Sequence, residues 1–205
     1  MQGLARLLLV AWNVQRANVA ILLGRRTAAM AAYGRILQRC PDHADARMVL
    51  GNWLAEAGDK VAAIEQFRCV IDHDKSHADA WFNLGFLHEE RGELAAAEAC
   101  LRQALELNPQ LDRAWYGLGL VRVRSGHLDE AVLAFQRNVK LQPFSPDGYC
   151  QLAMSLQRLG RTEAAHKVLH QLQGFEPNAA RALARDLESA QPAVGAPPSP
   201  AARVA

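Results

Sequence analysis

The chain has 205 residues, of which 50% are apolar and 21% are charged, a composition that is typical of a globular protein and excludes a wholly disordered one. The net charge of +2, without aromatic residues interleaved among lysines and arginines, does not indicate a nucleic-acid-binding protein. The four cysteines are far apart in the sequence and form no Cys-x-x-Cys motif, which argues against a zinc ribbon or a redox pair. Scattered cysteines of this kind are usually small buried side chains in a reducing compartment, so we expect a cytoplasmic protein.

The amino-terminal segment begins with an apolar run from Leu7 to Trp12 that follows Arg6. This run is shorter than the core of a usual signal peptide and is not followed by a small-residue cleavage site. A membrane span is disfavoured by Arg16, because a charged residue near the centre of a span costs roughly 2.5 kcal/mol or more. We therefore predict that residues 4–23 form a helix of the fold, with contact to a membrane surface as the lesser alternative.

The strongest pattern in the chain is an internal repeat of 34 residues. Three sets of residues follow this interval and agree in register: Gly24, Gly58, Gly92, Gly126 and Gly160; Ala29, Ala63, Ala97, Ala131 and Ala165; and Pro41, Pro109, Pro143 and Pro177, with Lys75 in place of the fifth proline. The sequence therefore divides into repeats at residues 10–43, 44–77, 78–111, 112–145 and 146–179.

Each repeat has the pattern of two helices joined by a tight turn. In the third repeat a first helix carries Trp81 and Gly85, and Gly92 follows where the chain must turn. A second helix is expected from about Leu94, and Pro109 ends it, because proline lacks the backbone donor and disfavours helical geometry before it. The sequence therefore predicts an all-α protein.

The residues Trp81, Leu84, Gly85, Ala97, Leu101, Ala104 and Pro109 together resemble the tetratricopeptide repeat. The resemblance covers residues 10–179 and implies a right-handed superhelical solenoid of antiparallel helix pairs. Three departures stand out: Arg47 replaces the large aromatic residue of the second repeat, Asn138 replaces an alanine in the fourth, and the first repeat has Asn13 and Arg16 where Trp and Leu are expected. Weak first and last repeats are expected, because terminal repeats lack one neighbour.

After the last repeat, the spacing of Leu183 and Leu187 predicts a capping helix over about residues 179–190. The solenoid domain is thus expected to cover residues 1–190. Residues 191–205 are rich in proline and alanine, and we predict that this tail is disordered.

Little in the sequence indicates catalysis. His166 and His170 lie four residues apart on a predicted helix, but no third ligand accompanies them, and His73 and His77 flank a predicted linker. The sequence has no glycine-rich phosphate loop and no nucleophile elbow. We expect no enzymatic activity, no metal and no cofactor.

In the family that the chain resembles, the first helices of successive repeats line a concave groove that binds a partner. By that resemblance, the predicted groove residues are Met48, Asn52, Phe82, Asn83, Phe86, Arg113, Tyr116, Leu120, Arg124, Cys150 and Met154. Chaperone-binding members hold a terminal carboxylate with Lys, Asn, Asn, Lys and Arg; the matching positions here are Met48, Asn52, Asn83, Arg113 and Gly117. Because the first Lys and the last Arg are missing, carboxylate clamping is not expected.

The leading functional prediction is a non-catalytic scaffold or adaptor that binds a peptide or amphipathic helix in this groove. Two alternatives remain open: a chaperone or assembly factor for a client protein, and a regulatory partner of a separate enzyme such as a glycosyltransferase. The sequence does not indicate the identity of the partner, the pathway or the oligomeric state.

Overall fold

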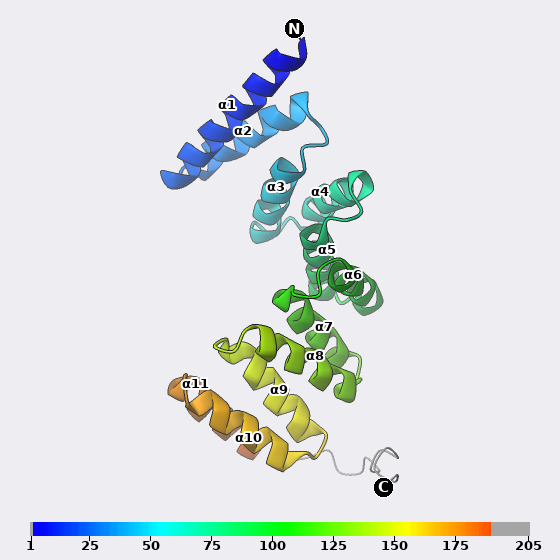
Figure 1. Cartoon of the computed structure of the whole chain (residues 1–205), viewed down its shortest axis with the longest axis vertical. Coiled ribbons are helices and arrows are strands. Elements are labelled where there is room, and N and C mark those ends of the chain that lie inside the picture. The colour runs from blue at the N-terminus through cyan, green and yellow to red at the C-terminus, as the bar shows by residue number, and fades with distance from the viewer. Residues whose placement is uncertain (1, 190–205) are drawn as a thin grey trace. The chain divides into compact units, whose positions relative to one another are not determined.

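The computed structural model describes the backbone of residues 2–189 and the side chains of residues 8–189 (Figure 1). These residues form eleven helices and no strand, which confirms the all-α prediction. The chain divides into two compact units, Met1–Asn108 and Pro109–Ala205, and each is described by itself. The predicted disordered tail at residues 191–205 lies outside the described residues.

Unit 1 consists of three helix pairs. The pairs are α1 (Gln2–Leu22) with α2 (Arg26–Arg39), α3 (Ala44–Glu56) with α4 (Lys60–His73), and α5 (Ala78–Glu90) with α6 (Leu94–Leu107). The helices of each pair pack against each other, and the pairs stack because α2 contacts α3, α4 contacts α5, and α3 contacts α5. The first helix agrees with the prediction that residues 4–23 belong to the fold.

Unit 2 contains two further helix pairs and a final helix. The pairs are α7 (Asp112–Arg124) with α8 (Leu128–Leu141) and α9 (Pro146–Arg158) with α10 (Thr162–Gln173). The final helix, α11 (Pro177–Ser189), packs against α9 and α10 and buries Ala180, Leu183 and Leu187. It begins slightly before the predicted start, because Pro177 takes the first helical position, where its missing N–H is not needed.

The five glycines at 34-residue intervals end the first helix of each pair in a left-handed conformation. Their φ values are +65° at Gly24, +87° at Gly58, +77° at Gly92, +80° at Gly126 and +73° at Gly160. No other type of residue has a positive φ in the described chain. Glycine is required here because a Cβ makes this conformation costly, which is the role that the sequence predicts.

Small residues let the two helices of a pair approach closely. The five repeating alanines are fully buried, and a Cβ added at Gly51 would lie 2.6 Å from Phe67 Cε1. In the next pair, a Cβ at Gly85 would lie 2.9 Å from Leu101 Cγ. In these two pairs, the glycine on the first helix therefore makes room for a large side chain of the second helix, as the repeat pattern predicts.

In the third, fourth and fifth repeats, a hydrogen bond from an aromatic side chain ties the start of the first helix to the preceding loop. Trp81 Nε1 donates to the Lys75 carbonyl and Trp115 Nε1 donates to the Pro109 carbonyl, both at 2.9 Å. Tyr149 Oη donates to the Pro143 carbonyl at 3.2 Å. The aromatic residue at this repeat position therefore fixes the loop as well as filling space.

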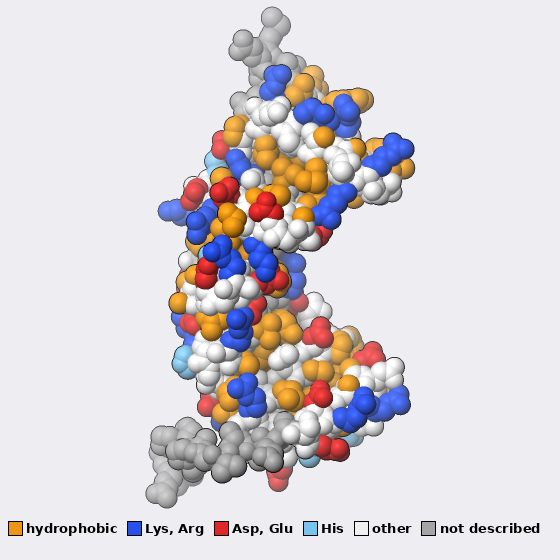
Figure 2. Space-filling model, turned by 180° about the vertical axis from the view of Figure 1, so that it is seen from behind, with side chains coloured by type: hydrophobic (Ala, Val, Ile, Leu, Met, Phe, Trp, Pro, Cys, Tyr) orange, Lys and Arg blue, Asp and Glu red, His pale blue; other side chains and the backbone are white. Residues whose placement is uncertain are grey.

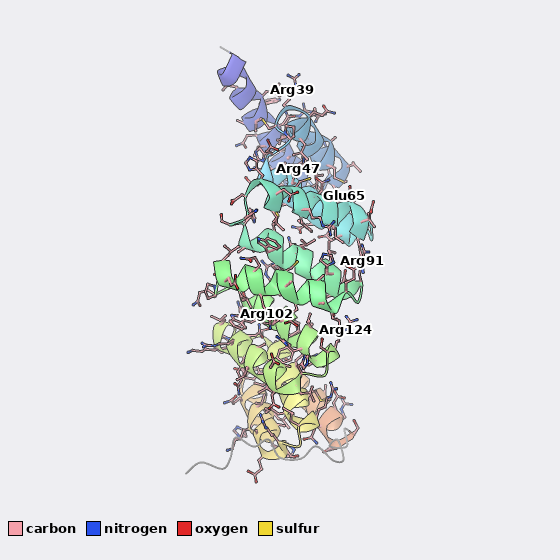
Figure 3. All side chains as sticks on the ribbon, turned by 90° about the vertical axis from the view of Figure 1, so that its right-hand side faces the viewer. Arg39, Arg47, Glu65, Arg91, Arg102 and Arg124 are labelled. Carbon is pink, nitrogen blue, oxygen red and sulfur yellow. The ribbon has the colours of Figure 1, made fainter. Side chains whose placement is uncertain are left out.

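Arg47, which Figure 3 labels, occupies the same position in the second repeat and makes the equivalent bond. Its Nε donates to the Pro41 carbonyl at 2.6 Å, and its Nη1 donates to Gln66 Oε1 at 2.8 Å. The departure from the aromatic pattern at Arg47 therefore keeps the hydrogen bond to the loop.

Asn138, the second departure, is buried at the contact between α8 and α9. Its Nδ2 donates to the Asp112 carbonyl at 3.0 Å, whereas its Oδ1 has no hydrogen-bond partner among the described residues. That oxygen fills the space where a Cβ of Gly148 would lie. The second, third and fourth repeats have alanine where Gly148 stands, so Asn138 and Gly148 form a matched pair that replaces an apolar contact.

Replacing Gly148 alone by alanine is expected to lower the free energy of unfolding by about 1–3 kcal/mol, because the new methyl group overlaps a buried amide. The double variant Gly148→Ala, Asn138→Ala is expected to lie within about 1 kcal/mol of the wild type, since it loses one hydrogen bond but also removes an unsatisfied acceptor. Urea unfolding followed by circular dichroism measures both. Additive losses in the double variant would show that the two residues do not compensate each other.

Candidate functional site

The first part of the candidate site lies on α3 and α5 of unit 1 and consists of Met48, Asn52, Phe82, Asn83 and Phe86, named here the unit 1 patch. Met48 packs against the core cluster that contains Phe67 and Leu84. Phe82 is half-buried, and Phe86 remains 48% exposed on the next turn of the helix. Phe86 is therefore the large apolar side chain of this patch that is most open to a partner.

The two asparagines of the unit 1 patch are hydrogen-bonded to each other. Asn83 Nδ2 donates to Asn52 Oδ1 at 3.0 Å and so links α5 to α3. Both amides keep further donors and acceptors that can meet the backbone of an extended peptide. The pairing places the two amide groups side by side on neighbouring helices.

The second part of the site lies on α7 and α9 of unit 2 and consists of Tyr116, Leu120, Cys150 and Met154, named here the unit 2 patch. All four side chains are half-buried and pack against one core cluster. The Tyr116 ring meets the buried Phe135 ring edge to face, with the centroids 5.8 Å apart. The floor of the patch is thus held by the core while the outer part of each side chain faces solvent.

Two carboxylates, those of Asp147 and Asp186, lie near the unit 2 patch. Burial, the Asp147 carboxylate and the neighbouring Cys150 raise the pKa of the Tyr116 hydroxyl above its ordinary value. Burial raises the pKa of the Cys150 thiol as well, with further contributions from Asp147 and Asp186. Figure 2 shows hydrophobic side chains with acidic groups among them on one face of unit 2. The patch is therefore apolar in the middle and negative at its edge.

The predicted arginines lie at the two ends of α7. Arg113 is exposed in the first turn, and Arg124 is exposed at the last helical position, where Figure 3 labels it. Both make interactions with other residues of the chain. They supply positive charge on the same helix as Tyr116 and Leu120, opposite in sign to Asp147.

Sequence reasoning missed the contribution of α11 to the unit 2 patch. Asp186 of α11 acts on Cys150, and Gln157 Nε2 of α9 donates to the Leu187 carbonyl at 3.3 Å. The spacing of Leu183 and Leu187 predicted the helix, but it did not indicate which neighbour would receive its charged face. The final helix therefore lies beside the patch as well as covering the core.

The other chemically notable side chains have structural roles. The rings of His43 and His77 accept the backbone N–H of Ala46 and Ala80 and cap α3 and α5. His166 and His170 are exposed, and no group of three or more potential metal ligands lies together within the described residues. None of the four cysteines forms a disulfide, and burial raises the pKa of the Cys100 thiol to about 11.

Three family models, each described as tetratricopeptide repeat, match residues 78–111, 14–71 and 112–145, which together make up more than half of the chain. The chain belongs to the tetratricopeptide repeat family. Tetratricopeptide repeat proteins act through protein interaction, and the unit 1 and unit 2 patches lie on the first helices of their repeats. No significant match to a curated protein sequence is found.

Solved structures of other tetratricopeptide repeat proteins share this fold. MamA is 24% identical, with 84% of this chain and 94% of that chain covered and a TM-score of 0.72. PilW, a type IV pilus biogenesis factor, is 21% identical, with 85% and 82% covered and a TM-score of 0.73. YrrB, a tetratricopeptide repeat protein with an unusual peptide-binding site, is 21% identical, with 85% and 89% covered and a TM-score of 0.69. At sequence identities of 21–24%, the likeness to these structures shows that the fold is shared.

Proposed function

We propose that the chain is a non-catalytic scaffold that binds a peptide or an amphipathic helix of a partner protein on the first helices of its repeats. The observation that carries this proposal is the unit 2 patch, where Tyr116, Leu120, Cys150 and Met154 remain half-buried on two neighbouring helices. Apolar side chains that are held by the core and open to solvent suit the burial of apolar anchors from a ligand.

The charges around the patch indicate the chemistry of the ligand. Asp147 lies near Tyr116 and Cys150, while Arg113 and Arg124 stand at the ends of α7. A ligand with apolar residues one helical turn apart, flanked by a basic residue on the side of Asp147, would complement this arrangement. The unit 1 patch adds Phe86 and the paired amides of Asn52 and Asn83 as a second contact surface.

Selection of peptides from a displayed random library tests the proposal. The selected peptides are expected to carry paired apolar residues and to bind the full chain in fluorescence polarisation. The variant Leu120→Ser, Met154→Ser is expected to weaken binding by about 30-fold or more, because loss of an anchor contact costs about 2 kcal/mol. The variant Phe86→Ser tests the unit 1 patch separately.

The matched control is Leu133→Ser, which removes an equally apolar side chain from the exposed face of α8 in the same unit. Circular dichroism must show that every variant keeps its helical content. If the selected peptides bind the Leu120 and Met154 variant as tightly as the control, the unit 2 patch is not the binding site.

A further inference from the structure

Helix α1 presents a large apolar face that the fold does not use. Trp12 and Leu22 keep 64% and 85% of their surface exposed, and Leu8 and Val19 are also exposed. At about 100° of rotation per residue, these four side chains fall within about 80° of the helix circumference and so share one face. From Leu8 to Leu22 the face is about 20 Å long, at about 1.5 Å per residue.

The opposite face of α1 makes the contacts that stabilise unit 1. Ala17 and Ala20 are buried, and Ala17 packs in a cluster with Tyr33 and Ile36 of α2. Asn13 is buried on the same side, where its Oδ1 accepts a hydrogen bond from Arg35 Nε at 3.2 Å. The apolar face that carries Trp12 therefore does not take part in the core packing of unit 1.

The amino-terminal end of the chain carries only positive charges. Residues 1–41 contain six arginines and no Asp, Glu or Lys, which gives +6, whereas the whole chain carries +2. Residues 42–205 therefore carry −4. Figure 2 shows hydrophobic and basic side chains together at the amino-terminal end.

A cavity of about 310 Å³ lies along the junction of α1 and α2. Its lining includes the apolar Trp12, Val19 and Leu23, together with Arg16 and Arg25. Neither of these two arginine side chains makes an ion pair with another described residue. Two unpaired guanidinium groups beside an apolar recess suit a phosphate group that is joined to hydrocarbon.

We propose that α1 docks on an anionic phospholipid surface, with Leu8, Trp12, Val19 and Leu22 entering the interface and Arg16 and Arg25 contacting lipid phosphates. This role goes beyond peptide binding on the unit 1 and unit 2 patches and brings the chain that carries them to a membrane. An exposed helix that combines Trp and Leu with arginine lies in the plane of the interface. None of the described helices is long and apolar enough to cross a bilayer.

The charge pattern favours a lipid surface over a protein. Interfaces between proteins are usually specified by charges of both signs, and two copies of this end would bring like charges together. An anionic leaflet attracts every arginine, and each basic residue near such a surface contributes about fivefold to binding.

Sedimentation of the full chain with phosphatidylcholine vesicles, with and without phosphatidylserine, tests the proposal. Binding is expected only with phosphatidylserine, and high salt should weaken it, because the screening length falls to about 3 Å at 1 M. The variant Arg16→Gln, Arg25→Gln is expected to lose about 25-fold in partitioning. Brominated lipids are expected to quench tryptophan fluorescence in the wild type but not in Trp12→Phe, which keeps an apolar side chain and still binds.

The control variant is Val61→Gln, Leu133→Gln, which changes exposed apolar side chains on α4 and α8 and should bind vesicles as the wild type does. Equal sedimentation with and without phosphatidylserine would overturn the proposal, and so would a lack of quenching. A concentration-dependent dimer that Trp12→Gln, Val19→Gln abolishes, in a chain that does not bind vesicles, would assign this face to a second copy instead. Peptide binding on the two patches is measured separately and does not depend on any of these results.

Discussion

Replacing Phe135 by alanine is expected to lower the free energy of unfolding by about 3–5 kcal/mol, because a large aromatic side chain is removed from a close-packed core. Phe135 is fully buried in α8, in the cluster that joins α8, α9, α10 and α11. Its ring also supports Tyr116, a residue of the unit 2 patch. Urea unfolding followed by circular dichroism measures the loss.

Leu133 of the same helix provides the matched control. Its side chain is 62% exposed, so Leu133→Ala should change the free energy of unfolding by no more than about 0.5 kcal/mol. If the two variants lose similar stability, the position of Phe135 at the centre of the unit 2 core is wrong. Phe135→Ala is also expected to weaken peptide binding to the unit 2 patch, since Tyr116 loses the ring beneath it.

Two glycine-to-alanine changes in helix interiors are expected to have opposite signs. At Gly119 a Cβ would lie 2.6 Å from Phe135 Cζ, and this buried ring cannot move away, so Gly119→Ala should cost about 1–3 kcal/mol. At Gly34, in α2, a Cβ meets no atom within 4 Å, and Gly34→Ala should therefore raise the free energy of unfolding by about 1 kcal/mol.

A double-mutant cycle identifies the cause of the loss at Gly119. Phe135→Leu shortens the side chain that the new methyl group would strike, so Gly119→Ala should cost less in that background than in the wild type. Thermal and urea unfolding of the four proteins measure the coupling. A cost at Gly119 that is independent of residue 135 would show that backbone conformation, and not contact with the ring, requires the glycine.

The register of the helix pairs was predictable because it depends on local chemistry. A left-handed turn accepts glycine at little cost, and all five repeating glycines have a positive φ. A close helix crossing excludes large side chains, and the repeating alanines are fully buried. Such requirements recur in every repeat, so a single sequence displays them several times.

The roles of the departing residues were not predictable in the same way. Arg47 keeps the hydrogen bond of the aromatic residue that it replaces, and Asn138 fills the space left by Gly148. Each role depends on a contact in space, with the Pro41 carbonyl or with the backbone at Gly148, that the repeating pattern of residue types does not show. Sequence spacing identified the positions as unusual but could not show the compensation.

For the candidate site as well, some features were predictable from the sequence and others were visible only in the tertiary structure. The period of 34 residues indicates which segments are first helices, and the resemblance to the tetratricopeptide repeat then names the residues of both patches. Their degree of exposure, the approach of Asp186 to Cys150 and the free apolar face of α1 came only from the tertiary structure. The physical reason is that helix formation and turns depend on neighbours along the chain, whereas burial and charge proximity depend on which helices pack against each residue.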